Sequence, residues 1–291
     1  MTTHHEHSPG HHPHAHGSHN DHQHSDEQGM AQMLDLDALL LKEHLRQIFE
    51  WTAGHHQNPR SIMDLGAGTG TGTLGLARTF PEASVLAVDQ SEFMLGRLVA
   101  TADEHGLSPR ISTAQVDLDQ AWPEAKDVDL VWAASSMHHM GNPARVFEHI
   151  ATTLSADGML VVVEMDKFPR YLPRELGFGV PGLEERCHEA ADSASWNAHP
   201  DWADPIHNAG MAMIEQRTFD YAIDDDQKLV ARAAHRWLSR MHAALQDSLS
   251  VADLQALEML LDDEGPQSVF MRTDLSMRGS RTVWAARISQ G

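Results

Sequence analysis

The strongest chemical signal in the chain is a glycine-rich run at residues 64–70, with the sequence DLGAGTG, between a short apolar segment and a helical pattern. Glycines at such a turn let the backbone approach a ligand closely and adopt positive φ. A second acid, Asp89, ends the next apolar segment, where it is placed to accept both hydroxyls of a ribose. Turns of this kind also occur in proteins that bind NAD, FAD and other nucleotides, so the two acids carry the prediction of a nucleoside-containing cofactor.

A second cluster of reactive residues lies at the N-terminus. The first 24 residues contain ten of the 22 histidines: His4, His5, His7, His11, His12, His14, His16, His19, His22 and His24. Neutral imidazole binds Zn, Ni, Cu and Co, so this segment predicts a divalent-metal-binding tail, which we expect to be non-catalytic because it offers no closed site. Residues 1–29 contain no Leu, Ile, Val, Phe or Trp, so we expect them to be disordered. The alternatives are a solvated leader without a metal role and a purification appendage.

The secondary-structure elements that position these residues are indicated by short apolar runs that alternate with helical patterns. Strands are predicted at 61–65, 84–88, 111–116, 130–134, 160–164, 211–221 and 282–288. Helices are predicted from Met30 to Trp51, from Thr71 to Pro81, from an N-cap at Ser91 to Gly106, and from an N-cap at Asn142 to near Gly158. This alternation predicts an α/β fold with a mostly parallel sheet, and the two late strands predict a terminal antiparallel addition.

The remaining segments divide the chain into a tail, residues 1–29, and one domain, residues 30–291. Two helical insertions, at about 167–209 and 224–265, are predicted to form a lid over the substrate. For the apolar stripes of these insertions and of the helix after Met30, packing against the core is the favoured interpretation, and closure over a ligand is the alternative.

Composition excludes several classes of function. The formal net charge of −21 disfavours nucleic acid, an anionic membrane surface and a highly phosphorylated substrate, and it favours a neutral or cationic substrate. The single cysteine, Cys187, cannot form an internal disulfide, which indicates a reducing, cytoplasmic setting. No apolar run reaches the roughly 20 residues of a spanning helix, and no signal peptide is recognisable.

Together, these motifs resemble the class I S-adenosylmethionine-dependent methyltransferases that act on small molecules. The resemblance runs from about Ser61 to Glu164 and includes the fourth-strand sequence DLVWAASSMHH at residues 129–139 and the fifth-strand segment at 154–162. It implies a Rossmann-like seven-stranded sheet with helices on both faces, its last strand antiparallel. It also implies S-adenosylmethionine as cofactor and S-adenosylhomocysteine as product. The implied cofactor-binding residues are Asp64, Gly66, Ala67, Gly68, Gly70, Asp89, Gln90, Met94, Asp117, Leu118, Ala133 and Ser135.

Asp117 is the least certain of these positions, because Asp119 lies in the same loop. Within the resemblance, Asp117 matches the acid that contacts the adenine. Either carboxylate can instead face solvent.

The acceptor is expected beyond the carboxyl ends of the fourth and fifth strands, near Ser135, His138, Glu164 and Asp166. His138 is the candidate general base for a hydroxyl acceptor, and a structural histidine is the alternative. Further candidate bases are Glu164, His188, His199, His207 and His242. The stretch from Ala134 to Met137 lacks the prolines typical of adenine- and glutamine-methylating members and the acid of metal-dependent catechol-type members. The chain has one cysteine, so it lacks the cysteine cluster of arsenic-methylating members.

The sequence therefore predicts an enzyme that transfers a methyl group to O, N or C of a small organic acceptor by in-line displacement, with no nucleic-acid or membrane partner and no metal in the folded domain. The alternative is a non-catalytic metal-handling or regulatory protein that works through its tail. A dehydrogenase is a third interpretation. The oligomeric state is left open.

Overall fold

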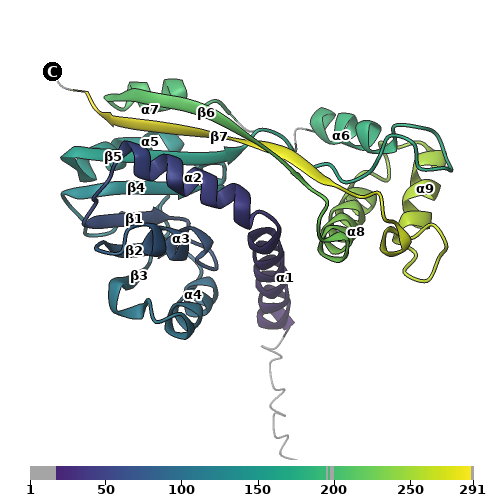
Figure 1. Ribbon diagram of the computed structural model, residues 1–291, viewed down its shortest axis with the longest axis horizontal. Helices are drawn as coiled ribbons and strands as arrows, with labels where there is room; N and C mark the ends of the chain where they lie inside the picture. Colours follow the sequence, from purple (N-terminus) through teal and green to yellow (C-terminus); the bar gives the residue numbers. More distant parts are fainter. Residues whose placement is uncertain (1–17, 195, 197–199, 290–291) are drawn as a thin grey trace, which may run out of the picture.

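The computed structural model describes residues 18–194, 196 and 200–289, which form one seven-stranded sheet in the order β3-β2-β1-β4-β5-β7-β6 (Figure 1). β7 runs antiparallel to both of its neighbours, and the other six strands are parallel to one another. The strands are β1 Ser61–Leu65, β2 Ser84–Asp89, β3 Ile111–Gln115, β4 Val128–Ala134, β5 Leu154–Met165, β6 Met211–Ile223 and β7 Met277–Ile288. The predicted sheet and its antiparallel last strand are confirmed.

Helices cover both faces of this sheet. They are α1 Ser18–Leu40, α2 Lys42–His55, α3 Thr71–Thr79, α4 Glu92–Glu104, α5 Pro143–Thr153, α6 Leu183–Ser193, α7 Ala203–Asn208, α8 Gln227–Ala244 and α9 Val251–Leu261, with single 3-10 turns at Ser108–Arg110, Met137–His139 and Val269–Met271. One core contains apolar residues of α2, α3 and α8, and the other contains residues of α5 and α7. No helix in the described residues is long and apolar enough to cross a bilayer.

The helix starts follow the local sequence. The side chains of Ser91 and Asn142 accept hydrogen bonds from the backbone N–H groups of Met94 and Arg145, as the predicted N-caps require. The end of α5 differs from the prediction, because the helix stops at Thr153 and β5 begins at Leu154. Leu154 pairs with Val128 of β4, so the chain continues as a strand and not as a helix. A side chain at Gly158 would lie 2.7 Å from the carbonyl oxygen of Val128.

The N-terminal segment also departs from the prediction. The expected helix over Met30–Trp51 is two helices divided at Leu41, and α1 begins at Ser18, so residues 18–29 are helical and not disordered. Contacts with the folded body explain this extension. Glu27 accepts a 2.7 Å hydrogen bond from the Ser91 hydroxyl, and the Gly29 carbonyl accepts one of 2.8 Å from Arg236 of α8. Residues 1–17 lie outside the described part of the chain.

The helices of the first predicted insertion lie in two different places. Figure 1 shows α6, α8 and α9 grouped at the far end of the long β6–β7 ribbon. In contrast, α7 lies within the first predicted insertion but packs against α5 and β6, where Trp202 and Ile206 join the core beside Phe147. Burial of these apolar side chains explains why α7 belongs to the sheet layer.

Candidate active site

The glycine turn lies between β1 and α3 and has a tightly constrained backbone. Gly66, Gly68 and Gly70 have φ values of +69°, +52° and +94°, which side chains disfavour. The N–H groups of Gly66 and Ala67 donate to the Val88 carbonyl at the end of β2, at 2.8 and 3.0 Å. A Cβ at Gly66 would lie 2.5 Å from Cβ of Ser136. The turn is therefore fixed from both neighbouring strands, and we call residues 66–70 with Asp89 the cradle. Side chains added at Gly66, Gly68 and Gly70 would meet Ser136, Leu34 and Leu98.

Asp89 is half-buried at the end of β2 and organises the same cradle. Its Oδ2 accepts a 2.8 Å hydrogen bond from the N–H of Gly68, and its Oδ1 accepts one of 2.9 Å from the N–H of Ser91. A carboxylate has about four acceptor positions, so each oxygen retains capacity for a hydroxyl group. This geometry fits the predicted role of Asp89 in binding a ribose.

Asp64 lies behind the cradle. Its side chain is buried, and its Oδ2 accepts a 2.6 Å hydrogen bond from the hydroxyl of Thr73 on α3. Burial raises its pKa to about 7 from an ordinary value of 3.8, and the hydrogen bond from Thr73 opposes this shift. The Asp64 side chain therefore holds β1 to α3, and its contact with a cofactor stays a prediction.

The predicted adenine side consists of two apolar and two polar positions. Met94 and Leu118 are buried, whereas Gln90 and Asp117 are exposed. The Asp119 carboxylate accepts hydrogen bonds from the N–H groups of Gly141 and Asn142, at 2.8 and 3.1 Å, and so fixes the start of α5. Asp119 therefore has a structural role, and the contact of Asp117 with the adenine stays a prediction.

The end of β4 brings two serines to the cradle. Ala133 is fully buried in the strand, and Ser135 follows with a φ of +52°, its N–H donating to the Val163 carbonyl of β5 at 2.8 Å. The hydroxyls of Ser135 and Ser136 are buried and have no hydrogen-bond partner among the described residues. Unsatisfied buried hydroxyls are rare in folded proteins and mark this edge as a ligand-facing position.

A histidine–carboxylate pair lies beside these serines. Nδ1 of His138 is 2.8 Å from Oε2 of Glu164, whose side chain is 2% exposed, and the His138 backbone N–H is directed to the same carboxylate at 3.4 Å. From the sequence, the two residues are separate candidate bases, and their pairing was missed. Their positions could have indicated the pairing, because β4 and β5 are parallel neighbours and both residues lie near the carboxyl ends of these strands.

The other candidate bases are dispersed. The Asp166 carboxylate accepts hydrogen bonds from Ser280 and Thr282 on β7, His188 is buried in α6, and His242 lies 3.7 Å from Glu258. His207 is exposed on α7, and His199 lies outside the described residues. Asp166, predicted to line the acceptor site, follows β5 at the same edge as His138, whereas the described histidines His188, His207 and His242 lie on α6, α7 and α8.

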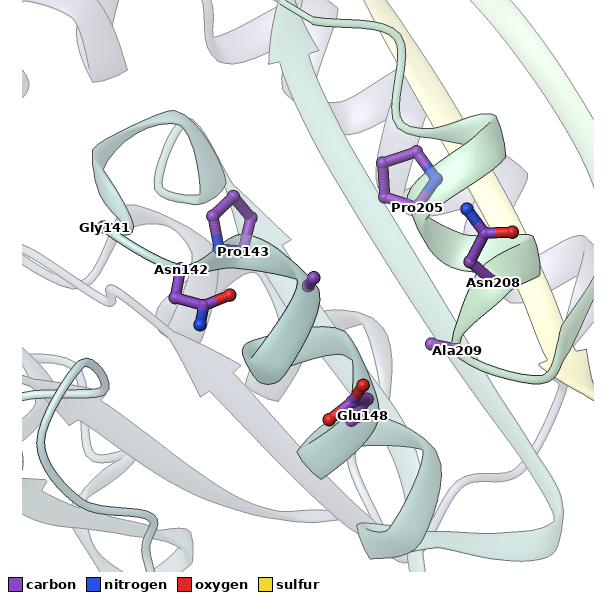
Figure 2. A pocket seen from close by; sticks show the side chains of 8 residues that line it. Gly141, Asn142, Pro143, Glu148, Pro205, Asn208 and Ala209 are labelled. Carbon is purple, nitrogen blue, oxygen red and sulfur yellow. The ribbon is translucent and has the colours of Figure 1, made fainter.

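A hollow of about 310 Å³ lies away from the cradle, between α5 and α7. Figure 2 shows Asn142, Pro143 and Glu148 on one side, with Pro205 and Asn208 on the other. Its lining includes one carboxylate and no cationic side chain, and it contains none of the predicted site residues. The hollow therefore contributes nothing to the chemistry of the cradle or of the His138–Glu164 pair. No group of three or more metal-ligating side chains occurs within the described residues either.

Comparison with known proteins agrees with this geometry. Residues 62–158 match the family model described as "Methyltransferase domain", a range that contains the glycine turn, Asp89 and His138. These residues form a class I methyltransferase domain. The match covers about a third of the chain and leaves α1, α6 to α9 and the β6–β7 ribbon outside the matched range.

Relatives with similar sequences share this methyltransferase domain. A trans-aconitate 2-methyltransferase of Acidovorax sp. is 29% identical over 53% of this chain and 58% of its own length. One from Yersinia pseudotuberculosis is 26% identical over 72% of this chain and 80% of its own length. The chain thus spans less than two thirds of the Acidovorax relative.

Solved structures extend the likeness beyond the methyltransferase domain. A Bacillus halodurans protein provisionally described as a methyltransferase superposes with a TM-score of 0.54 at 18% identity, covering 84% of this chain and 99% of its own. A Galdieria sulphuraria protein provisionally described as a sarcosine dimethylglycine methyltransferase gives 0.51 at 16% identity, covering 87% of each chain. At this identity the likeness establishes the fold alone.

Proposed function

We propose that this protein transfers the methyl group of S-adenosylmethionine to a small-molecule acceptor by in-line displacement. The observation that carries the proposal is the cradle formed by the positive-φ glycine turn and the Asp89 carboxylate within a methyltransferase domain. The sequence relatives, whose names describe methylation of a small organic acid, support the same reaction type.

The residues of the cradle fit a sulfonium nucleoside. The backbone at Gly66, Gly68 and Gly70 leaves room for the amino-acid portion, and Asp89 accepts hydrogen bonds from the ribose. Met94 and Leu118 offer apolar surface to the adenine, with Asp117 at its polar edge. When bound, S-adenosylmethionine supplies a methyl group already activated by the positively charged sulfur, so the protein needs chiefly to position and desolvate the reactants.

The acceptor side contributes a base. Glu164 holds Nδ1 of His138, which favours the tautomer with its proton on Nδ1 and directs Nε2 as the nitrogen that takes a proton from a hydroxyl acceptor. Buried Glu164 then stabilises the imidazolium that results. The Ser135 hydroxyl, at the same edge, is placed to orient the acceptor.

The proposal also includes a cytoplasmic location and a metal-binding tail. The lone cysteine, buried in α6, fits a cytoplasmic protein. The tail histidines, of which His4 to His16 precede the described residues, supply ligands for a divalent metal without entering the reaction. The non-catalytic alternative, in which the tail is the working part, finds no support among the described residues.

Isothermal titration calorimetry with S-adenosylmethionine and S-adenosylhomocysteine tests the cofactor assignment. The double variant Asp89→Ala with Gly68→Val should abolish binding, because it removes the ribose acceptor and places a branched side chain where Cβ alone is 3.2 Å from Leu34. Asp220→Ala, which removes an exposed acid from edge strand β6, serves as the control and should bind normally. Undiminished binding by the double variant would refute the assignment. A mass-spectrometric product screen with methyl-labelled cofactor then identifies the acceptor.

A further inference from the structure

A group of neighbouring polar side chains outside residues 62–158 contains buried nitrogen atoms that lack hydrogen-bond partners among the described residues. Its members come from α1, α2, the segment after β5, β6 and β7: Asp37, His44, Tyr171, Tyr221 and Arg281. None of these side chains makes a hydrogen bond or ion pair with the described residues, and both ring nitrogens of His44 and Nε of Arg281 are buried. Because buried polar groups are nearly always paired, the three unpaired nitrogens of His44 and Arg281 require an explanation.

These side chains face one another. Tyr221 pairs with Gly279, and Phe219 with Arg281, so Tyr221 and Arg281 lie on the same face of the β6–β7 ribbon. The Tyr221 hydroxyl lies directly against Gly279, where any side chain would displace it. The His44 ring packs edge-on against Tyr221 with the ring centres 4.9 Å apart. Asp37 interacts electrostatically with both Arg281 and Tyr171, which closes the group from the α1 side.

The group lies at the carboxyl end of β5, at the edge of the sheet that also carries the proposed reaction centre. Arg281 pairs with Met165 in the β5–β7 ladder, so its side chain lies on the face of the sheet opposite to that of Glu164, which pairs with Thr282 and holds His138. The Asp166 carboxylate, next along β5, is already bonded to Ser280 and Thr282 and does not neutralise Arg281 through an ion pair. Ligands in sheets of this kind bind beyond the carboxyl ends of the parallel strands. The unpartnered group therefore borders the place where the acceptor must sit.

The charge of Arg281 determines which ligand groups can bind beside it. Its side chain is only 8% exposed, yet no carboxylate lies within ion-pair distance among the described residues, and a buried charge without a partner is costly. Burial raises the pKa of Asp37, against the opposing influence of Arg281 and Arg236, so this carboxyl is a poor counter-ion. A guanidinium binds carboxylate with two parallel hydrogen bonds, and phenol hydroxyls add further donors.

We propose that Arg281, together with Tyr171 and Tyr221, anchors a carboxylate of the methyl acceptor. This inference rests on the proposed function and narrows its acceptor to a small organic acid. It reverses the expectation from net charge that a neutral or cationic substrate would be preferred. The local arginine, not the overall acidity of the surface, faces the substrate.

Ligand-observed NMR titrations of the full chain, saturated with S-adenosylhomocysteine, test the anchor with succinate, trans-aconitate and the uncharged succinamide. At least one of the two carboxylates should bind the wild type, with succinamide much weaker. Arg281→Met should weaken carboxylate binding about 10- to 100-fold, the range expected for lost hydrogen bonds to a charged group. Tyr221→Phe, which removes a single hydroxyl, should weaken it less and serves if Arg281→Met does not fold.

Arg287→Met is the matched control, because Arg287 occupies the same face of β7 near its far end and donates to the His55 carbonyl. It should leave carboxylate binding unchanged. Equal binding of succinate and succinamide, unchanged binding in Arg281→Met and Tyr221→Phe, or binding of neither carboxylate by the wild type would overturn the anchor. Inorganic phosphate binding as well as the carboxylates would overturn the assignment to organic acids. S-adenosylhomocysteine affinity, measured on the same samples, reports separately on the cofactor site.

Discussion

The two halves of the proposed active site are built on opposite principles. On the cofactor half, around β1 and β2, the polar groups Asp64 and Asp89 have their partners within the protein: a threonine hydroxyl and two backbone N–H groups. On the proposed acceptor half, His44 of α2 and Arg281 of β7 have buried nitrogen atoms without partners among the described residues. A site whose polar groups are already paired is suited to a cofactor that a whole family uses. Unpaired polar groups are suited to binding one particular acceptor, as we propose. The comparison predicts that substitutions in the first half cost stability and those in the second half cost binding.

The largest expected effect lies where the halves meet. Glu164→Gln should lower the rate of methyl transfer about 100-fold, because the neutral amide no longer favours the Nδ1-protonated tautomer of His138 or stabilises its imidazolium. Cofactor affinity should not change. The rate is measured with the acceptor from the product screen, and ¹⁵N NMR of the imidazole reports the tautomer. If the rate falls with no change in tautomer or in the pH profile, Glu164 has only a structural role.

Gly66→Ala tests how rigid the cofactor half is. The added methyl group would meet Ser136 at 2.5 Å in a backbone conformation with φ of +69°, so we expect a loss of about 3 kcal/mol from overpacking and left-handed strain together. Urea unfolding measures the loss. Gly106→Ala is the control, since its φ is +68° but nothing lies within 4 Å, and it should lose only about 1 kcal/mol. Equal losses would show that the turn is not packed as described.

The pH dependence of stability tests the buried acid on the cofactor half. Because the folded-state pKa of Asp64 is raised to about 7, the folded state binds a proton that the unfolded state has already released above pH 4. Its contribution to stability is therefore lost as pH rises from about 4 through 7, by about 2 kcal/mol between pH 5 and pH 7. Asp64→Asn should flatten this decline in urea unfolding measured at each pH.

Asp253→Asn provides a control of opposite sign. The hydrogen bond from Arg186 lowers the pKa of Asp253, so its contribution is present above the unfolded pKa and disappears as pH falls through the lower folded value. Removing that carboxylate should cost stability near neutrality and little in acid. A variant of Asp64 that declines as steeply as the wild type would contradict the assigned pKa.

The smallest effect is expected on the acceptor half and has a favourable sign. Replacing His44 by Phe removes two buried, unpaired nitrogens while keeping ring contacts with Phe219 and Tyr221, and should raise the unfolding free energy by about 1 kcal/mol. Carboxylate binding should weaken at the same time. His188→Phe, in the lid, is a comparison with one unpaired nitrogen at a site away from Arg281. A destabilised His44→Phe would mean that the ring is paired in solution.

Particular elements illustrate where sequence reasoning succeeded. The strands β1, β2 and β4 were located because each is a short apolar run. The N-caps at Ser91 and Asn142 were located because capping is decided within four residues. The end of α5 was misplaced because pairing of Leu154 with Val128, residues remote in sequence, stopped the helix. The helical state of residues 18–29 was missed for the same reason, since Ser91 and Arg236 hold that segment from a distance.

The sequence by itself determined the sheet, the glycine cradle and the acid that completes it, because a strand, a turn and a helix start depend on neighbours along the chain. Only the tertiary structure decided that Asp64 faces Thr73, that Glu164 holds His138, and that Arg281 is buried without an ion-pair partner among the described residues. The physical reason is that charge and hydrogen bonding act through space. The net charge of the chain gave the wrong expectation for the acceptor if one buried guanidinium, brought in by the last strand, binds it.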